Sequence, residues 1–334
     1  MGATAKKALV TGAAGFIGYY VCEALLARGV ETLGIDNLNS YYFPLLKRDR
    51  LERLANREGF RFAEADIADH EKLAALAGDV DVIIHLAAQA GVRHSIKAPF
   101  DYAASNLVGH LSMLELARHA ARSPLLVYAS SSSVYGANTK TPFSESDPVT
   151  KPVSLYAATK RADELMSESY ARLYGLNQIG LRFFTVYGPW GRPDMAYWTF
   201  TENILSGKPI PVFNEGKLKR DFTYIDDIVK GVIACALEPS HFTGEAPHKV
   251  YNIGNNQPVE LMRFIEVIEN AVGVRAIKDF KPMQPGDVYE TFADIDAIAA
   301  DYGFAPSTPL EHGVPRFVDW YKGYRARLGA AEGV

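Results

Sequence analysis

The chain has 334 residues and a formal net charge of −4, with 35 Lys and Arg against 39 Asp and Glu. This length exceeds what one ordinary hydrophobic core serves, so we expect a large domain and a smaller one. The charges form no basic stripe, which argues against a nucleic-acid partner. The longest apolar stretch, 80–88, contains His85 and falls far short of the roughly 20 residues of a membrane span. With no apolar signal region after MGATAKK, we expect a cytoplasmic globular protein.

Short apolar runs alternate with amphipathic helical patterns over the first half of the chain. The runs are nearly continuous in Val, Ile and Leu, as parallel strands are when helices cover both faces of their sheet. This pattern predicts a doubly wound parallel α/β sheet. The expected strands are 7–11, 31–35, 60–65, 80–86, 125–129 and 177–183, and the expected helices are 15–28, 45–57, 71–76, 102–121 and 155–173.

The alternation of apolar runs and helical patterns changes after residue 184. The stretch GPWGRP at 188–193 is rich in helix and strand breakers, so we expect the chain to leave the sheet there. The following patterns predict a smaller α+β lobe, with strands at 210–213, 219–224 and 248–253 and helices at 199–206, 225–237, 261–271, 295–300 and 311–324. The expected domains are therefore 1–185, joined by 225–253, and a second lobe made of 186–224 and 254–330.

A glycine-rich loop follows the first expected strand. The sequence ALVTGAAGFIG (8–18) places Gly12, Gly15 and Gly18 before an apolar helix. Such glycines permit a tight turn and close approach of a pyrophosphate, and the helix N-terminus offers free N–H groups. The spacing GxxGxxG departs from the commoner GxGxxG, and a purely structural turn is the alternative. Asp36 ends the second strand 18 residues after Gly18, where a carboxylate accepts from the adenosine ribose and repels a 2′-phosphate, so the loop predicts a Rossmann-type NAD site.

Tyr156 and Lys160 form a second candidate motif. They lie four residues apart at the start of an expected helix, so their side chains share one face. Free tyrosine titrates near about 10, too high for a base at neutral pH. A nearby ammonium and an oxidised nicotinamide would stabilise the phenolate as a general base. An ordinary surface helix is the alternative for the pair alone, but the glycine loop and the serine run 130–133 favour catalysis.

These motifs together resemble the extended short-chain dehydrogenase/reductase family of nucleotide-sugar enzymes. Longer stretches are similar to its UDP-glucuronate 4-epimerase subfamily and span most of the chain. They are GIDNLNSYY (34–42), HLAAQAGVRHS (85–95), SSSSVYGANTKTPFSE (130–145), PVSLYAATK (152–160), LRFFTVYGPWGRPDM (181–195) and KRDFTYIDDI (219–228).

The resemblance implies an NAD-dependent isomerase that inverts C4 of UDP-glucuronic acid to give UDP-galacturonic acid. A hydride passes to bound NAD⁺, the 4-keto sugar turns over, and the hydride returns to its other face without net redox. Tyr156 would take the proton of the 4-hydroxyl, Lys160 would bind the nicotinamide ribose and tune Tyr156, and Ser131 would bridge the 4-oxygen and Tyr156. The NAD contacts implied are Gly12, Gly15, Phe16, Ile17, Gly18, Asp36, Asn37, Asp66, Ile67, Leu86, Ala87, Ala88, Asn106, Tyr156 and Lys160.

The residues after Ser131 separate this reaction from its neighbours. Nucleotide-sugar 4,6-dehydratases place an Asp-Glu pair there, and UDP-glucuronate decarboxylases resemble Thr-Ser-Glu, whereas this chain has Ser132 and Ser133. UDP-galactose 4-epimerases carry Asn where Thr185 stands. Oxidation at C4 would make the uronic acid a β-keto acid prone to lose CO₂. Our hypothesis is that Ser132, Ser133 and Thr185 hold its carboxylate out of alignment while leaving it anionic. Ser130 is expected to be structural, with its hydroxyl on nearby backbone.

The UDP half is expected in the second lobe. By family position Arg192 and Arg220 are candidates for the diphosphate or uridine, because a guanidinium suits phosphate oxygens. Asp287 is a candidate for the uridine ribose, Phe213 for stacking on uracil, and Arg93 for a place near the sugar. Solvated surface charge is the alternative for each arginine, and core packing is the alternative for Phe213.

Three further expectations concern oligomeric state, the two cysteines and metal binding. The helices at 102–121 and 155–173 have apolar faces beyond one sheet contact, and in this family such helices pair into a four-helix bundle, which implies a homodimer. Cys22 and Cys235 lie in helical patterns and are expected to be buried hydrophobes rather than a disulfide. His85 and His94 lack metal-ligand spacing, so no metal is predicted.

Four other functions stay open at this point. They are a 4-epimerase of a neutral or N-acetylated UDP-hexose, a UDP-glucuronate decarboxylase, a dehydrogenase that releases NADH, and an NAD-binding regulator without catalysis. The intact set of Ser131, Tyr156 and Lys160 argues against the last.

Overall fold

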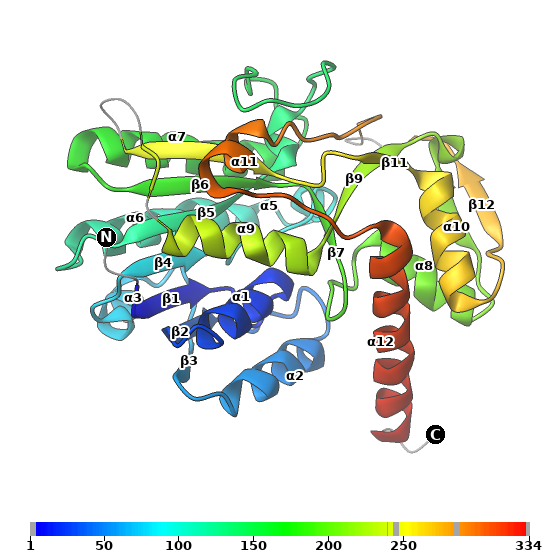
Figure 1. Ribbon diagram of the computed structural model, residues 1–334, viewed down its shortest axis with the longest axis horizontal. Helices are drawn as coiled ribbons and strands as arrows, with labels where there is room; N and C mark the ends of the chain where they lie inside the picture. The colour runs from blue at the N-terminus through cyan, green and yellow to red at the C-terminus, as the bar shows by residue number, and fades with distance from the viewer. Residues whose placement is uncertain (1–4, 239, 243–246, 284–287, 332–334) are drawn as a thin grey trace.

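A seven-stranded parallel sheet forms the larger part of the molecule (Figure 1). The computed structural model describes residues 5–238, 240–242, 247–283 and 288–331. The strand order is β10-β6-β5-β4-β1-β2-β3, which is the 3-2-1-4-5-6 order of dinucleotide-binding sheets extended by β10. The strands are β1 (Lys7–Thr11), β2 (Glu31–Asp36), β3 (Phe60–Glu64), β4 (Val82–His85), β5 (Leu125–Ser131), β6 (Gln178–Phe183) and β10 (His248–Ile253).

Helices cover both faces of this sheet, and the doubly wound prediction is confirmed. On one face α1 (Phe16–Leu26) packs between α2 (Pro44–Ala55) and α9 (Ile225–Leu237). On the other, α6 (Gly109–His119) packs between α3 (His70–Ala77) and α7 (Leu155–Tyr174). The central strand β4 is buried along its whole length, which explains its unbroken apolar run.

The expected helix over 102–121 is confirmed as a continuous helical run over 99–119, but its start is a π-helical turn rather than a regular α-helix. The run consists of α5 (Pro99–Tyr102), a π-helical segment η1 (Ala103–Val108) and α6. The wider turn carries Asn106, whose side chain is hydrogen-bonded to the backbone of Gln89 and to Thr159 on α7. Tertiary hydrogen bonds of this kind leave no periodic signal in the sequence, so the apolar pattern predicted the helix but not its π-helical turn.

The second lobe contains two small sheets and three packed helices. One sheet has the order β11-β9-β7, and the other pairs β8 with β12. Helix α10 packs against α8 and α12, and α11 lies against β10 (Figure 1). The elements of the lobe are β7 (Thr185–Tyr187), α8 (Ala196–Leu205), β8 (Ile210–Phe213), η3 (Asn214–Gly216), β9 (Lys219–Tyr224), β11 (Pro258–Glu260), α10 (Leu261–Val272), β12 (Lys278–Lys281) and α12 (Leu310–Ala331). The short helices α4 (His94–Lys97), η2 (Ser132–Tyr135) and α11 (Asp296–Tyr302) pack against elements of the large sheet and its helices.

Both cysteines are fully buried free thiols, as the sequence predicts. Burial raises the pKa of Cys22 and of Cys235, so both behave as small apolar side chains. In the part of the chain that the structure describes, no helix combines the length and the apolar character needed to cross a bilayer.

Candidate active site

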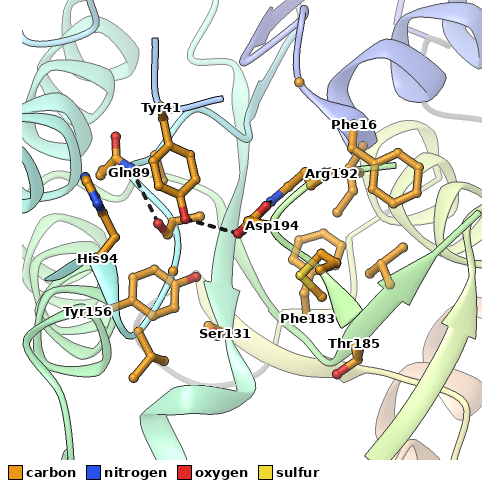
Figure 2. A pocket seen from close by; sticks show the side chains of 18 of the residues that line it. Phe16, Tyr41, Gln89, His94, Ser131, Tyr156, Phe183, Thr185, Arg192 and Asp194 are labelled. Atoms are coloured by element: carbon orange, nitrogen blue, oxygen red, sulfur yellow. Dashed lines mark hydrogen bonds and ion pairs between the residues drawn. The ribbon is translucent and has the colours of Figure 1, made fainter. Parts of the chain in front are cut away.

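A cavity of about 830 Å³ lies at the carboxyl ends of the central strands, between the large sheet and the second lobe (Figure 2). The chain order reverses at β1, which has β2 on one side and β4 on the other, and ligands of open α/β sheets bind at such a point. Most of the predicted site residues line this one cavity. They are Gly12, Gly15, Phe16, Ile17, Gly18, Asp36, Asn37, Ile67, Leu86, Ala87, Ala88, Arg93, Ser131, Ser132, Ser133, Tyr156, Lys160, Thr185, Arg192, Phe213 and Arg220.

Two of the predicted residues that the structure describes, Asp66 and Asn106, do not line the cavity. Asp66 is exposed and accepts a hydrogen bond from Asn37 Nδ2, on the cavity wall, at 2.8 Å. Asn106 is 1% exposed, accepts from Gln89 N at 2.8 Å and donates to Thr159 Oγ1 at 2.9 Å, so it connects the cavity wall to α7. Asp287 lies outside the described residues.

The glycine loop forms a backbone floor that fits a dinucleotide. Gly12 has a φ of +73°, and a Cβ there would lie 2.8 Å from Ala87 N. A Cβ at Gly18 would lie 2.0 Å from the Gly12 carbonyl oxygen, so close helix packing also requires glycine there. Helix α1 begins after Gly15 with no side chain capping its first N–H groups. These open donors suit a pyrophosphate.

Asp36 lies at the end of β2, at the other side of this floor. Its carboxylate accepts from Ala14 N at 3.2 Å and from Leu38 N at 2.9 Å, which fixes its orientation. Burial raises the pKa of Asp36, against the effect of Lys47 and of these hydrogen bonds. A carboxylate held in this way retains lone pairs for ribose hydroxyls. The residues present therefore fit NAD.

Tyr156 and Lys160 stand on the first turns of α7. The helix begins at Leu155, and Ser154 Oγ caps it by accepting from Ala157 N at 3.1 Å. Figure 2 shows the Tyr156 hydroxyl directed into the cavity, on the side where Ser131 lies. Lys160 is 2% exposed, and its Nζ donates to Ala129 O at 2.9 Å and to Asp163 Oδ2 at 3.0 Å. The lysine therefore ties α7 to β5 two residues before Ser131.

The serine run divides between the cavity and the core. Ser131 Oγ accepts from Ser133 N at 3.2 Å and donates to Ser133 Oγ at 3.1 Å, so it caps the short turn η2. Ser130 Oγ instead donates to Glu164 Oε1 at 2.6 Å. The expectation that this hydroxyl serves nearby backbone is wrong, because alternation along β5 sends the two neighbouring side chains to opposite faces. Glu164 is a buried acid that also pairs with Arg182 at 2.8 Å.

The proposed UDP half of the cavity contains three arginines. The Arg93 guanidinium lies over the Phe213 ring at 5.3 Å, which joins the two lobes across the cavity. Arg192 donates to both oxygens of Asp194, at 3.0 and 2.6 Å. Arg220 donates to the carbonyl oxygens of residues 219 and 289 at 2.8 and 3.2 Å. This positive charge suits an anionic ligand.

The sequence did not predict Tyr41 and Asp194, which line the cavity, or Arg50, which is buried beside it. Tyr41 donates to Asp194 Oδ2 at 3.0 Å across 153 residues of sequence, and both side chains face the cavity in Figure 2. Burial raises the pKa of Tyr41 to about 12, and Asp194 acts in the same direction, so the phenol stays a donor. Arg50 is fully buried and donates to the carbonyls of Ala14 and Trp190, which joins the glycine loop to the 188–193 segment. The Tyr41–Asp194 pair and the contacts of Arg50 form only when the chain folds, so sequence periodicity does not reveal them. Tyr41 and Asp194 do lie within 34–42 and 181–195, two of the stretches that resemble the family.

A buried histidine, His85, lies beside the cavity. Burial, together with Lys160, lowers the pKa of His85 to about 3, so its ring is neutral. His85 Nδ1 lies 2.7 Å from Thr11 Oγ1, beside the cavity floor. Among the residues that the structure describes, no group of three His, Cys, Asp or Glu side chains is placed to hold a metal ion.

Comparisons with known proteins agree with this geometry. The model of the NAD dependent epimerase/dehydratase family matches residues 8–254. A probable UDP-glucuronate 4-epimerase of Rhizobium meliloti is 47% identical over 328 residues, covering 94% of this chain and 96% of that protein. UDP-glucuronate 4-epimerase 1 of Arabidopsis thaliana is 47% identical over 329 residues, covering 95% and 76%. A mutant UDP-glucuronic acid 4-epimerase of Bacillus cereus, solved with UDP-4-deoxy-4-fluoro-glucuronic acid and NAD, superimposes with a TM-score of 0.87 at 32% identity and covers 95% and 99%. The chain belongs to the NAD dependent epimerase/dehydratase family.

Proposed function

We propose that this family member is a UDP-glucuronate 4-epimerase, an NAD-dependent isomerase that converts UDP-glucuronic acid into UDP-galacturonic acid. One observation carries the proposal. A single cavity joins the dinucleotide floor, the catalytic set of Ser131, Tyr156 and Lys160, and the neutral hydroxyls of Ser132 and Thr185. The relatives named UDP-glucuronate 4-epimerase, at 47% identity, support the substrate.

The chain's own residues supply the proton chemistry. The glycine loop and Asp36 would hold NAD, which would supply a hydride acceptor and donor for C4 of the sugar. Tyr156 takes the proton of the 4-hydroxyl and later returns it, while the Ser131 hydroxyl bridges the 4-oxygen and the phenol. Lys160 presents positive charge beside Tyr156, and two fixed acceptors leave one of its N–H groups for the cavity. The same groups act in both directions, so the reaction has no net redox change.

The remaining NAD contacts form two layers. Residues of the glycine loop and Asn37 touch the dinucleotide directly, together with the cavity wall at 86–88 and Ile67. Asp66 and Asn106 act through cavity residues, since one accepts a hydrogen bond from Asn37 and the other from Gln89.

The substrate carboxylate is held by hydroxyls. Ser132, Ser133 and Thr185 are neutral donors on the cavity wall, and they can orient a carboxylate without neutralising it. Loss of CO₂ from a β-keto acid requires the breaking C–C bond to lie parallel to the carbonyl π orbital. A carboxylate carbon held near the plane of the carbonyl does not meet that condition, so the 4-keto sugar survives until its reduction.

The nucleotide lies toward the second lobe. Arg192, Arg220 and Arg93 place positive charge where a diphosphate would lie, and Phe213 offers a ring face for uracil. Asp287 is proposed for the uridine ribose from the resemblance alone.

A substrate panel tests the proposal. The purified protein is incubated separately with UDP-glucuronate, UDP-glucose and UDP-N-acetylglucosamine, and the products are separated by anion-exchange chromatography. We expect conversion of UDP-glucuronate only, into UDP-galacturonate. Conversion of a neutral hexose in its place, accumulation of a UDP-pentose, or steady growth of absorbance near 340 nm would assign the protein to one of the alternative activities.

A further inference from the structure

Asp163 is the buried acid beside Lys160. It lies three residues further along α7, is fully buried, and its Oδ2 accepts from Lys160 Nζ at 3.0 Å. The same Nζ donates to Ala129 O at 2.9 Å. An ammonium has three N–H groups, so acceptors on α7 and on β5 fix two of them. The third is the one available to the cavity, which Lys160 lines.

The surroundings of Asp163 do not favour stability. Its second oxygen, Oδ1, is buried without a hydrogen-bond partner among the described residues. A buried carboxylate that is only half satisfied costs free energy of folding compared with an apolar side chain. The next residue, Glu164, differs sharply, since it accepts from Ser130, Arg161 and Arg182. A structural role accounts for Glu164 and leaves Asp163 unexplained.

We propose that Asp163 is a positioning residue, which aims the free N–H of Lys160 into the cavity and limits the positive field that Lys160 exerts on Tyr156. The proposal rests on the function proposed above, in which Lys160 and Tyr156 act on cofactor and substrate. Asp163 contacts Lys160 and does not line the cavity, so it acts only through that lysine.

The other titratable groups around this pair keep constant charge near neutral pH. Burial lowers the pKa of His85, on β4, to about 3, and it lowers that of His110, on α6, well below its usual range. Burial raises the pKa of Tyr128, on β5, far above neutrality. It would also raise the pKa of Glu164, but hydrogen bonds from its arginine partners keep that acid ionised. Burial raises the pKa of Asp163 to about 6, with Lys160 opposing it, so Asp163 changes charge in the range in which activity is measured.

Two substitutions separate charge from position. Asp163→Asn keeps an acceptor for Lys160 Nζ and removes the negative charge. The Tyr156 hydroxyl then experiences a larger positive field, and the acidic limb of the kcat profile should move to lower pH by about 0.5 to 1 unit. Asp163→Ala removes the acceptor as well and frees Lys160, so kcat should fall on the order of tenfold. The amount of NAD that stays bound per chain through gel filtration should fall with it.

A matched control comes from the same helix. Glu168 is a half-exposed acid on α7 that pairs with Arg172 and His248, outside the cavity. Glu168→Gln removes one negative charge, as Asp163→Asn does, and should leave both the pH profile and the NAD content unchanged. Circular dichroism of all the variants confirms that they are folded, and if Asp163→Ala does not fold, the Asn variant decides.

The outcomes are distinct. A profile of Asp163→Asn that superimposes on that of the unmodified protein overturns the proposal, and so does an Asp163→Ala protein with normal kcat and NAD content. If the unmodified protein does not convert UDP-glucuronate at all, the proposed function is wrong. The NAD content of the Asp163 variants then still decides whether Asp163 positions Lys160, because that readout needs no sugar substrate.

Discussion

Two neighbouring serines at the end of β5 point to opposite faces of the sheet and contact different groups. Ser131 faces the cavity, whereas Ser130 is bonded to Glu164 in the core. The sequence predicts which serine faces the substrate because its register against Tyr156 matches the family. It does not reveal the partner of Ser130, since Glu164 lies 34 residues away and only folding brings the two together. The same limit applies to Tyr41 and Arg50, whose partners Asp194 and Trp190 lie 153 and 140 residues away.

Replacement of Tyr156 tests the proposed base. Tyr156→Phe keeps the ring and its edge-on contact with Tyr102 but removes the proton acceptor. We expect kcat to fall by about 10²- to 10⁴-fold while the bound NAD per chain stays unchanged. Steady-state assays and the ultraviolet spectrum of the protein measure the two quantities. Retention of more than a tenth of the activity would assign the proton transfer to another group.

Replacement of the cavity hydroxyls tests the proposed control of decarboxylation. In Ser132→Ala or Thr185→Val the carboxylate of the 4-keto sugar loses a donor, so the bond to its carbon can move out of the carbonyl plane and become parallel to the carbonyl π orbital. We expect a UDP-pentose by-product, or a sharp loss of uronate turnover, measured by chromatography of the products. Two variants with unchanged turnover and no UDP-pentose would show that the carboxylate is held by other residues.

At the scale of elements, the long strands and helices follow from the sequence and the irregular ones do not. Apolar runs flanked by glycine or polar residues predicted six strands of the main sheet to within a few residues, and 248–253 was predicted with the observed bounds. The strands β7 and β11 have three residues each, and their pairing with β9 comes from the packing of the second lobe. The π-helical segment at Ala103–Val108 depends on the hydrogen bonds of Asn106.

The contact between α7 and β6 leads to a prediction about stability. Glu164 and Arg182 form a buried ion pair under the serine run. Glu164→Gln leaves the arginine charge without its partner, so the free energy of unfolding should fall by about 3 kcal/mol at pH 7. The folded-state pKa of Glu164 lies below its unfolded value of 4.5, so this stabilisation is complete above pH 4.5 and disappears as pH falls through the folded value.

Urea unfolding at pH 7 and in acid measures this effect. The difference between the variant and the unmodified protein should shrink as pH falls. A difference that is constant with pH would show that Glu164 stabilises the fold by packing rather than by charge.

At the scale of the whole molecule, one face carries unpaired apolar side chains. On η1, α6 and α7 the exposed fractions are 46% for Val108, 39% for Leu111, 55% for Leu165 and 67% for Leu173. We propose that this face forms a homodimer through a four-helix bundle, as the family resemblance implies. The expected division of the chain into two domains likewise stays a prediction.

Light scattering tests the dimer. Leu165→Asp places a charge in the proposed interface, so the mass should fall from that of two chains to that of one. Leu45→Asp, on α2 of the opposite face, has a similar exposure of 48% and should leave the mass unchanged. A single-chain mass for the unmodified protein would contradict the proposed bundle.

The central claim is that one bound NAD carries the hydrogen of C4 away from the sugar and back to the same sugar. Proton and deuterium NMR of the product from UDP-glucuronate deuterated at C4, with purified protein and no added cofactor, tests it most directly. We expect UDP-galacturonate that retains deuterium at C4 and contains no hydrogen from water at that carbon. UDP-galacturonate that has lost this deuterium to solvent, or the absence of any product without added NAD, would contradict it.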